Sequence, residues 1–143
     1  MLVKQISVFV ENKPGRMAAI LEVLAYNEID ISALSIADTT DFGVLRLIVS
    51  DPEKAKKVLN DAGVVVKTTD VVAASMEDRP GGLAEVLNVI NDGKIMIEYM
   101  YAFAGRGKMG AMVVIKVNNP ERATELLENA GITMLDQETA FGK

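Results

Sequence analysis

An internal repeat constrains the fold of this chain more than any other feature. The stretch NKPGRMAAILEVL at residues 12–24 recurs as DRPGGLAEVLNVI at 78–90, with proline, glycine and the apolar positions in the same order. A second stretch, DPEKAKKVLNDAG at 51–63, recurs as NPERATELLENAG at 119–131. The offset between copies is 66 residues at the first stretch and 68 at the second. The chain is therefore one structural unit written twice.

The size of the repeat predicts that its two copies depend on each other. The 143 residues divide into one copy at 1–68 and another at 69–143. A unit this small buries too little of its surface to be comfortably stable alone. We therefore expect the copies to share a core or a sheet, and residues 1–68 to be oligomeric or poorly folded when expressed alone.

Hydrophobic periodicity predicts the same order of elements in each copy, namely strand, helix, strand, strand, helix and strand. The first copy is expected to contain strand 4–11, a helix carrying Met17, Ile20, Leu21 and Leu24, strands 29–37 and 42–50, a helix between Asp51 and Gly63, and strand 64–68. The second copy is expected to contain strand 69–76, a helix carrying Leu83, Val86, Leu87 and Ile90, strands near 95–103 and 110–118, a helix between Asn119 and Gly131, and strand 132–138.

This order predicts the fold class. A βαββαβ unit with short crossovers is ferredoxin-like, with its helices on one face of the sheet. Two such units have edge strands that need covering, and edge-to-edge pairing covers them. We expect an α+β chain of two ferredoxin-like βαββαβ units, packed side by side with paired sheets.

Composition excludes several function classes. The sequence has no cysteine and no histidine, which removes thiol nucleophiles, histidine bases, structural zinc sites and disulfides. A net charge of −5 argues against a nucleic-acid partner. No apolar run approaches the roughly 18 residues of a membrane span, and the N-terminus alternates like a strand. We expect a cytoplasmic protein that is not an enzyme and binds no cofactor, metal, nucleic acid or membrane.

The turn from the first strand to the first helix repeats best, as ENKPGR at 11–16 and EDRPGG at 77–82. Glycine there permits positive φ and close approach of a ligand, and the helix N-terminus favours a carboxylate. Asn12 and Asp78 can accept from an ammonium group. These features fit a free amino acid, although a tight turn that needs Pro-Gly for geometry alone is the alternative.

The element order, the N-x-P-G and D-x-P-G turns, and the apolar runs RMAAILEVLAYNEIDI and GLAEVLNVINDGKIMI together resemble the ACT domain, twice over nearly the whole chain. ACT domains are regulatory modules that bind amino acids or similar ligands between paired units. The resemblance implies two pseudo-symmetric sets of contacts: Asn12, Lys13, Gly15 and Arg16 facing Ile97, Glu98 and Tyr99, and Asp78, Arg79, Gly81 and Gly82 facing Ile31, Ser32 and Ala33.

The two sets are expected to be unequal. Arg16 follows the first glycine and can pair with a carboxylate, whereas Gly82 follows the second and gives more room at the helix start. The ligand's side chain stays open, because Ile31 and Ile97 would suit an apolar one and Glu11, Glu98 or Asp78 a basic one.

The resemblance implies a regulatory sensor that binds a free amino acid and signals to a separate enzyme of amino-acid metabolism, with the chain forming a homodimer. The alternative is a structural or assembly module of the same fold that binds no ligand. A free amino acid that raises the melting temperature would distinguish the two.

Two further motifs are assigned no function. GRGKMG at 105–110 matches the dinucleotide pattern G-x-G-x-x-G, but it precedes a predicted strand and not a helix, which predicts a hairpin loop. The stretch DFGVLRLIV at 41–49 lacks the aromatic residues of an RNA-binding sheet, and the chain is acidic.

Overall fold

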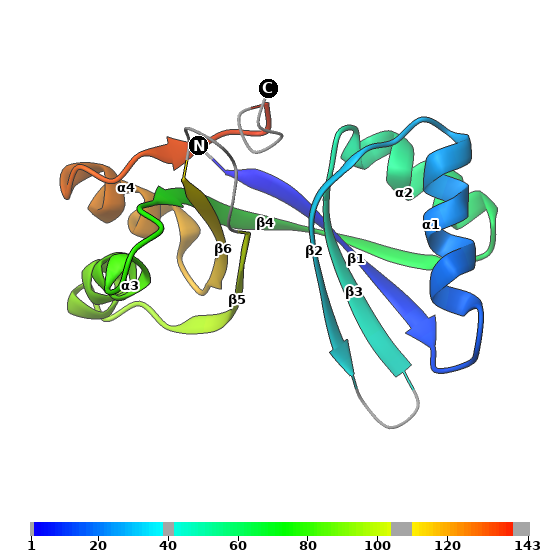
Figure 1. Ribbon diagram of the computed structural model, residues 1–143, viewed down its shortest axis with the longest axis horizontal. Helices are drawn as coiled ribbons and strands as arrows, with labels where there is room; N and C mark the ends of the chain where they lie inside the picture. Colours follow the sequence, from blue (N-terminus) through cyan, green and yellow to red (C-terminus); the bar gives the residue numbers. More distant parts are fainter. Residues whose placement is uncertain (1, 39–41, 104–109, 139–143) are drawn as a thin grey trace. The chain divides into compact units, whose positions relative to one another are not determined.

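Each copy of the repeat builds a sheet with two helices (Figure 1). The structure is a computed structural model that describes residues 2–38, 42–103 and 110–138. By their contacts, Lys4–Thr69 form an N-terminal unit, and the residues from Asp70 onward form a C-terminal unit that also includes Val3.

The N-terminal unit has the ferredoxin-like arrangement. Its elements are β1 (Val3–Glu11), α1 (Arg16–Tyr26), β2 (Ile31–Asp38), β3 (Phe42–Val49), α2 (Pro52–Asp61) and the first part of β4 (Val65–Met76). Strand β3 pairs antiparallel with both β1 and β2, and β1 neighbours β4, so that the order is β4-β1-β3-β2. Figure 1 shows α1 and α2 on the same side of this sheet.

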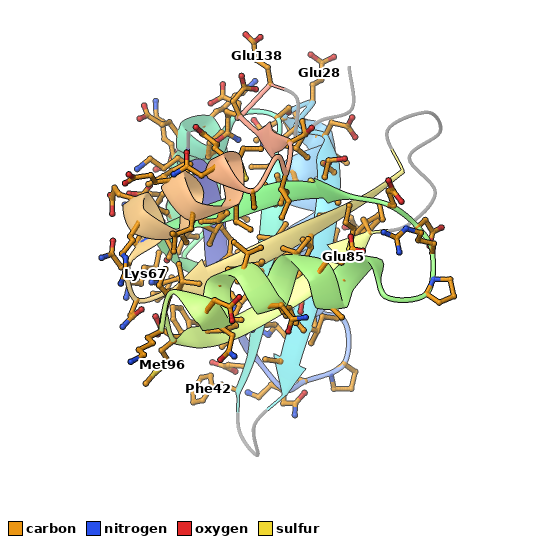
Figure 2. The ribbon with its side chains drawn as sticks, turned by 90° about the vertical axis from the view of Figure 1, so that its left-hand side faces the viewer. Glu28, Phe42, Lys67, Glu85, Met96 and Glu138 are labelled. Carbon is orange, nitrogen blue, oxygen red and sulfur yellow. The ribbon has the colours of Figure 1, made fainter. Side chains whose placement is uncertain are left out.

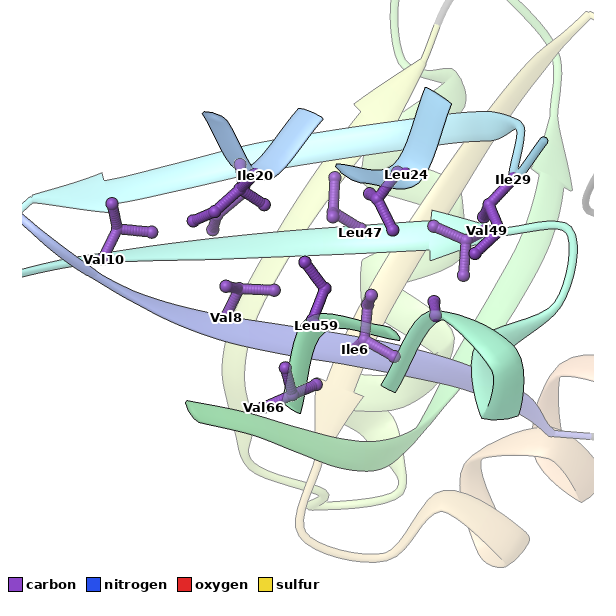
Figure 3. Close-up of a cluster of buried hydrophobic side chains, with 12 residues drawn as sticks. Ile6, Val8, Val10, Ile20, Leu24, Ile29, Leu47, Val49, Leu59 and Val66 are labelled. Atoms are coloured by element: carbon purple, nitrogen blue, oxygen red, sulfur yellow. The ribbon is translucent and has the colours of Figure 1, made fainter. Parts of the chain in front are cut away.

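The core of this unit lies between the sheet and its two helices (Figure 3). Ile6 and Val8 alternate along β1 and point toward the helices, which contribute Ile20 and Leu24 from α1 and Leu59 from α2. All of these side chains are buried. The alternation in the sequence therefore marks the face of β1 that packs against the helices.

The C-terminal unit repeats the arrangement with its own core. Its elements are the second part of β4, α3 (Gly82–Asp92), β5 (Ile97–Phe103), β6 (Ala111–Val117), α4 (Pro120–Asn129) and β7 (Met134–Leu135). Strand β4 pairs with β6 and β7, and β6 pairs with β5, which gives the order β7-β4-β6-β5. Val86 and Ile90 of α3 and Leu127 of α4 pack over Ile115 of β6. The α+β fold class with tandem ferredoxin-like units is confirmed.

The second helix of each unit begins and ends where the sequence predicts. The Asp51 side chain accepts from the N–H of Lys54 at 3.1 Å, and the Asn119 side chain accepts from the N–H of Arg122 at 3.2 Å. Each cap satisfies one donor that the first helical turn leaves free. The glycines that follow these helices have positive φ, +83° at Gly63 and +81° at Gly131.

Four predicted elements differ from the structure or lie outside it. The strands predicted at 64–68 and 69–76 form one strand, β4, because no glycine or proline interrupts the run between them. The strand predicted at 132–138 is reduced to Met134–Leu135, which pairs with Ala73 and Ala74. Apart from Gly110, the hairpin loop predicted at residues 105–110 lies outside the described part of the chain. No helix among the described residues is long and apolar enough to cross a membrane.

Candidate functional site

The first helix of each unit begins at a glycine with left-handed backbone. Gly15 has φ 84° at the start of α1, and Gly81 has φ 85° at the start of α3. Glycine adopts this conformation without the strain that a Cβ would add. Neither helix has a side-chain cap, in contrast to the capped helices α2 and α4. The N–H groups of Arg16 and Gly82 donate to the carbonyl oxygens of Lys13 and Arg79, so the N–H groups that can bind an anion are the next ones of each first turn.

The turn of the N-terminal unit carries charges of both signs. Lys13 Nζ lies 3.1 Å from Glu11 Oε2. The hydrogen bond and charge of Lys13, together with the charge of Arg16, lower the pKa of Glu11 below its usual value. Arg16 is exposed, and within the described residues the structure records no ion pair for its guanidinium. Asn12 is also exposed in the bend between β1 and α1.

The turn of the C-terminal unit uses its arginine internally. Arg79 donates from Nε to Glu77 and from Nη2 to Glu85 Oε1 at 2.6 Å. These bonds, to Glu85 first and Glu77 second, raise the pKa of Arg79. Figure 2 labels Glu85 near the start of α3. Asp78 lies exposed beside this cluster. Arg79 is therefore less available to a ligand than Arg16 is.

Gly82 does not provide the extra room that the sequence suggests. A Cβ on Gly82 would overlap the backbone carbonyl oxygen of Glu77. At Gly81 the nearest atom to such a Cβ is Arg79 Nη1, at 3.9 Å. The second glycine is therefore required by the close approach of the chain to itself. The expectation of a roomier pocket at Gly82 is wrong, because the unit's own backbone fills the space.

We predict that Gly82→Ala lowers the free energy of unfolding by about 1–3 kcal/mol, the usual cost of overpacking, because the Glu77 carbonyl must move. Equilibrium urea unfolding measures the change. The matched control is Arg16→Ala at the equivalent position of the N-terminal unit, which already carries a Cβ and should change stability by less than about 0.5 kcal/mol. Equal stability of Gly82→Ala and the unchanged protein would contradict this packing.

The second strand of each unit starts with an irregularity at a predicted site residue. The register shifts at Ser32 in β2 and at Glu98 in β5. Glu98 Oε2 lies 3.2 Å from Lys116 Nζ on the neighbouring strand. Ile31, Ile97 and Tyr99 beside these positions are partly buried, and Ala33 is fully buried. A bulge turns side chains away from the regular alternation, as often happens next to binding sites.

Each unit keeps its glycine turn and its second-strand start apart. Glu11 pairs with Phe42 at one end of β3, whereas Ile31 pairs with Val49 at the other end. Asn12, Lys13, Gly15 and Arg16 thus lie together on one turn, away from Ile31 and Ser32 of the same unit. Asp78, Arg79, Gly81 and Gly82 likewise share a turn. The predicted contacts join the turn of one unit to the strand of the other and stay a prediction.

The sequence did not reveal a cavity at the base of each turn. In the N-terminal unit a cavity of about 320 Å³ lies between the end of β1, the first turns of α1 and residues 62–65 after α2. In the C-terminal unit a cavity of about 460 Å³ lies between the end of β4, the start of α3 and residues 130–133 after α4. In the sequence, the segments that follow α2 and α4 and line these cavities repeat as AGVV at 62–65 and AGIT at 130–133.

Comparisons with known proteins agree with this architecture. The sequence profile of the ACT domain pair family matches residues 1–140. The crystal structure of protein BT0572 from Bacteroides thetaiotaomicron is 44% identical, covers 99% of this chain and 96% of that chain, and has a TM-score of 0.92. A comparison with curated proteins gives no match.

The fold is also that of two kinase regulatory subunits. The regulatory subunit of aspartate kinase from Thermus thermophilus, in its ligand-free form, matches at 16% identity over 90% of this chain and 93% of that chain, with a TM-score of 0.66. The corresponding subunit from Thermus flavus matches at 16% identity over 90% and 92%, with a TM-score of 0.59. With the family profile spanning nearly every residue, this chain belongs to the ACT domain pair family.

Proposed function

We propose that this protein is a regulatory sensor that binds a free amino acid and catalyses no reaction itself. The observation that carries the proposal is the uncapped, left-handed glycine turn built twice, at Gly15 and Gly81. Both turns expose N–H groups at a helix start, where a carboxylate is favoured by hydrogen bonding and by the helix dipole. Membership of the ACT domain pair family supports a regulatory role.

The ligand is proposed to lie between the turn of one unit and the second strand of the other. Its carboxylate would meet the N–H groups behind Gly15 or Gly81, and its ammonium group would meet Asn12 or Asp78. The side chain would face the irregular strand starts at Ser32 and Glu98. Lys13, Arg16, Arg79, Gly82, Ile31, Ile97 and Tyr99 complete the two sets.

Signalling follows if ligand binding favours one arrangement of the protein over another. A ligand shifts such an equilibrium only by its difference in affinity for the two states. We propose that the protein is a homodimer in the cytoplasm. Its arrangement with ligand bound would act differently on a partner enzyme of amino-acid metabolism than its arrangement without ligand. The fold shared with regulatory subunits of aspartate kinase is consistent with a separate catalytic partner. A ligand-free assembly module of the same fold is the alternative.

The first test is a thermal screen with the twenty amino acids. A ligand at 100 times its Kd should stabilise the protein by about 2.7 kcal/mol. For a chain of this size the melting temperature should rise by about 5–10 °C. Calorimetric titration then measures Kd. If no amino acid at millimolar concentration moves the melting curve, the assembly module is favoured.

A matched pair of variants separates loss of binding from backbone strain. Gly15→Ala and Gly131→Ala each place a Cβ on left-handed backbone with no atom within 4 Å. Both should lose similar stability, about 1–2 kcal/mol. Only Gly15→Ala should weaken the binding of an amino acid at its turn.

A further inference from the structure

The cavity of the N-terminal unit has an apolar interior. Its volume of about 320 Å³ is at the small end for ligand pockets, which suits a single amino acid. Ile20 of α1 is buried in its wall, while Phe9, Phe42 and Val65 line it and stay 42%, 51% and 66% exposed. Val10 and Ile20 of the core, with Val64 packed against it, give the cavity its apolar wall next to the helices. An apolar group bound there would remove this surface from water.

Two side chains of opposite charge line the same cavity. Glu11 and Arg16 are both exposed, one at the end of β1 and the other at the start of α1. Glu11 is held ionised by the nearby positive charges of Lys13 and Arg16. A carboxylate can accept from an ammonium group, and a guanidinium can donate two parallel bonds to a carboxylate. This pair matches the two charged groups of a free amino acid.

The equivalent cavity of the C-terminal unit lacks both properties. At matching positions of the repeat, Ser75 replaces Phe9, Gly110 replaces Phe42 and Thr133 replaces Val65, as the two linings show. The cation is also absent there, because Gly82 replaces Arg16, and a second carboxylate, Glu85, replaces Ala19. Arg79 is bound to Glu77 and Glu85. The two cavities therefore differ in the chemistry of the ligand that each can hold.

We propose that the N-terminal cavity binds an amino acid with an apolar side chain, aliphatic or aromatic, and that the C-terminal cavity does not. The side chain enters between Ile20 and Val64, and the ammonium and carboxylate groups pair with Glu11 and Arg16. This inference rests on the proposed function. It moves the ligand from the space between the units into the cavity of one unit, and it adds the ligand class and an asymmetry between the units. One ligand is bound per chain at this cavity.

A matched pair of substitutions tests the location. Ala62 and Ala130 occupy equivalent positions at the ends of α2 and α4, with φ −84° in both, and both are exposed. Each lines the cavity of its own unit. Ala62→Leu should weaken the binding of leucine, isoleucine, valine, methionine or phenylalanine at least tenfold, because the new side chain fills the cavity. Ala130→Leu should leave the affinity within about threefold.

A charge variant tests the role of the guanidinium. Arg16→Gln removes the positive charge. It should weaken the binding of the same amino acid by about ten- to hundredfold, as expected for the loss of a hydrogen bond to a charged group. 4-Methylpentanoate, which is leucine without its ammonium group, should bind more weakly than leucine but lose affinity with Arg16→Gln as leucine does. All titrations use the full chain.

The outcomes separate this inference from the proposed function. Binding of a polar or charged amino acid alone would overturn the inference and leave the sensor function standing. The same holds if an apolar amino acid binds and Ala62→Leu has no effect, or if Ala62→Leu and Ala130→Leu weaken it equally. If none of the twenty amino acids binds the unchanged protein, both proposals fail.

Discussion

Leu24→Ala is expected to lower the free energy of unfolding by about 2–5 kcal/mol, and Ile90→Ala by a similar amount. The two residues occupy equivalent positions of the repeat, on α1 and α3, and neither side chain is exposed to solvent. Each lies in the core cluster of its own unit. Truncation to alanine removes buried methyl and methylene groups and leaves a cavity that the surrounding side chains fill only in part. Equilibrium urea unfolding followed by circular dichroism measures both changes.

The control for this pair lies on the same helix. Tyr26 is 88% exposed at the end of α1, so Tyr26→Ala removes a larger side chain without opening a cavity. Its cost should stay within about 0.5 kcal/mol. If Leu24→Ala costs no more than Tyr26→Ala, the N-terminal core is not packed as the structure describes.

Local signals in the sequence predict most of the fold. The alternation of β1 and the capped start of α2 depend on residues that are neighbours along the chain, and both are found as predicted. The repeat does not predict that two strands join into β4, because the boundary between the copies lies inside this strand and not at its end. The positions at which α1 and α3 end are also not predictable from the sequence. Glu28 and Lys94 take left-handed backbone there, with φ 57°, where glycine is the usual residue.

The candidate site is predictable only where it is local. The glycine turns stand out because glutamate, proline and glycine recur at the same positions of ENKPGR and EDRPGG, and glycine is favoured at positive φ. The cavity of the N-terminal unit draws Phe9, Ile20 and Phe42 from three separate elements and Val64 from the segment between α2 and β4, so no short motif marks it. The engagement of Arg79 depends on Glu85, which lies six residues away on the next helix. Such features need the tertiary structure.

A chain that ends at residue 68 is expected to be oligomeric or to lack a cooperative unfolding transition. The cut leaves four residues of β4, Val65–Thr68, as a frayed C-terminal strand at the edge of the sheet. Val66 is the β4 residue that belongs to the core of the N-terminal unit, so fraying removes part of that core. A unit of this size is only marginally stable even when intact.

The shortened strand also has an aggregation liability, because residues 65–68 form the edge of the sheet next to β1 and lose the rest of β4, which β6 and β7 pair at residues 72–76. Analytical ultracentrifugation and thermal unfolding of the fragment test the expectation against the full chain. A second fragment, residues 1–76, keeps all of β4 and separates the effect of a shortened strand from that of the missing unit. If fragment 1–68 is a monomer with a sharp transition, the repeat is a fully independent domain and the dependence of one copy on the other is wrong. If fragment 1–76 alone folds as a monomer, the dependence resides in the continuous strand and not in the rest of the second copy.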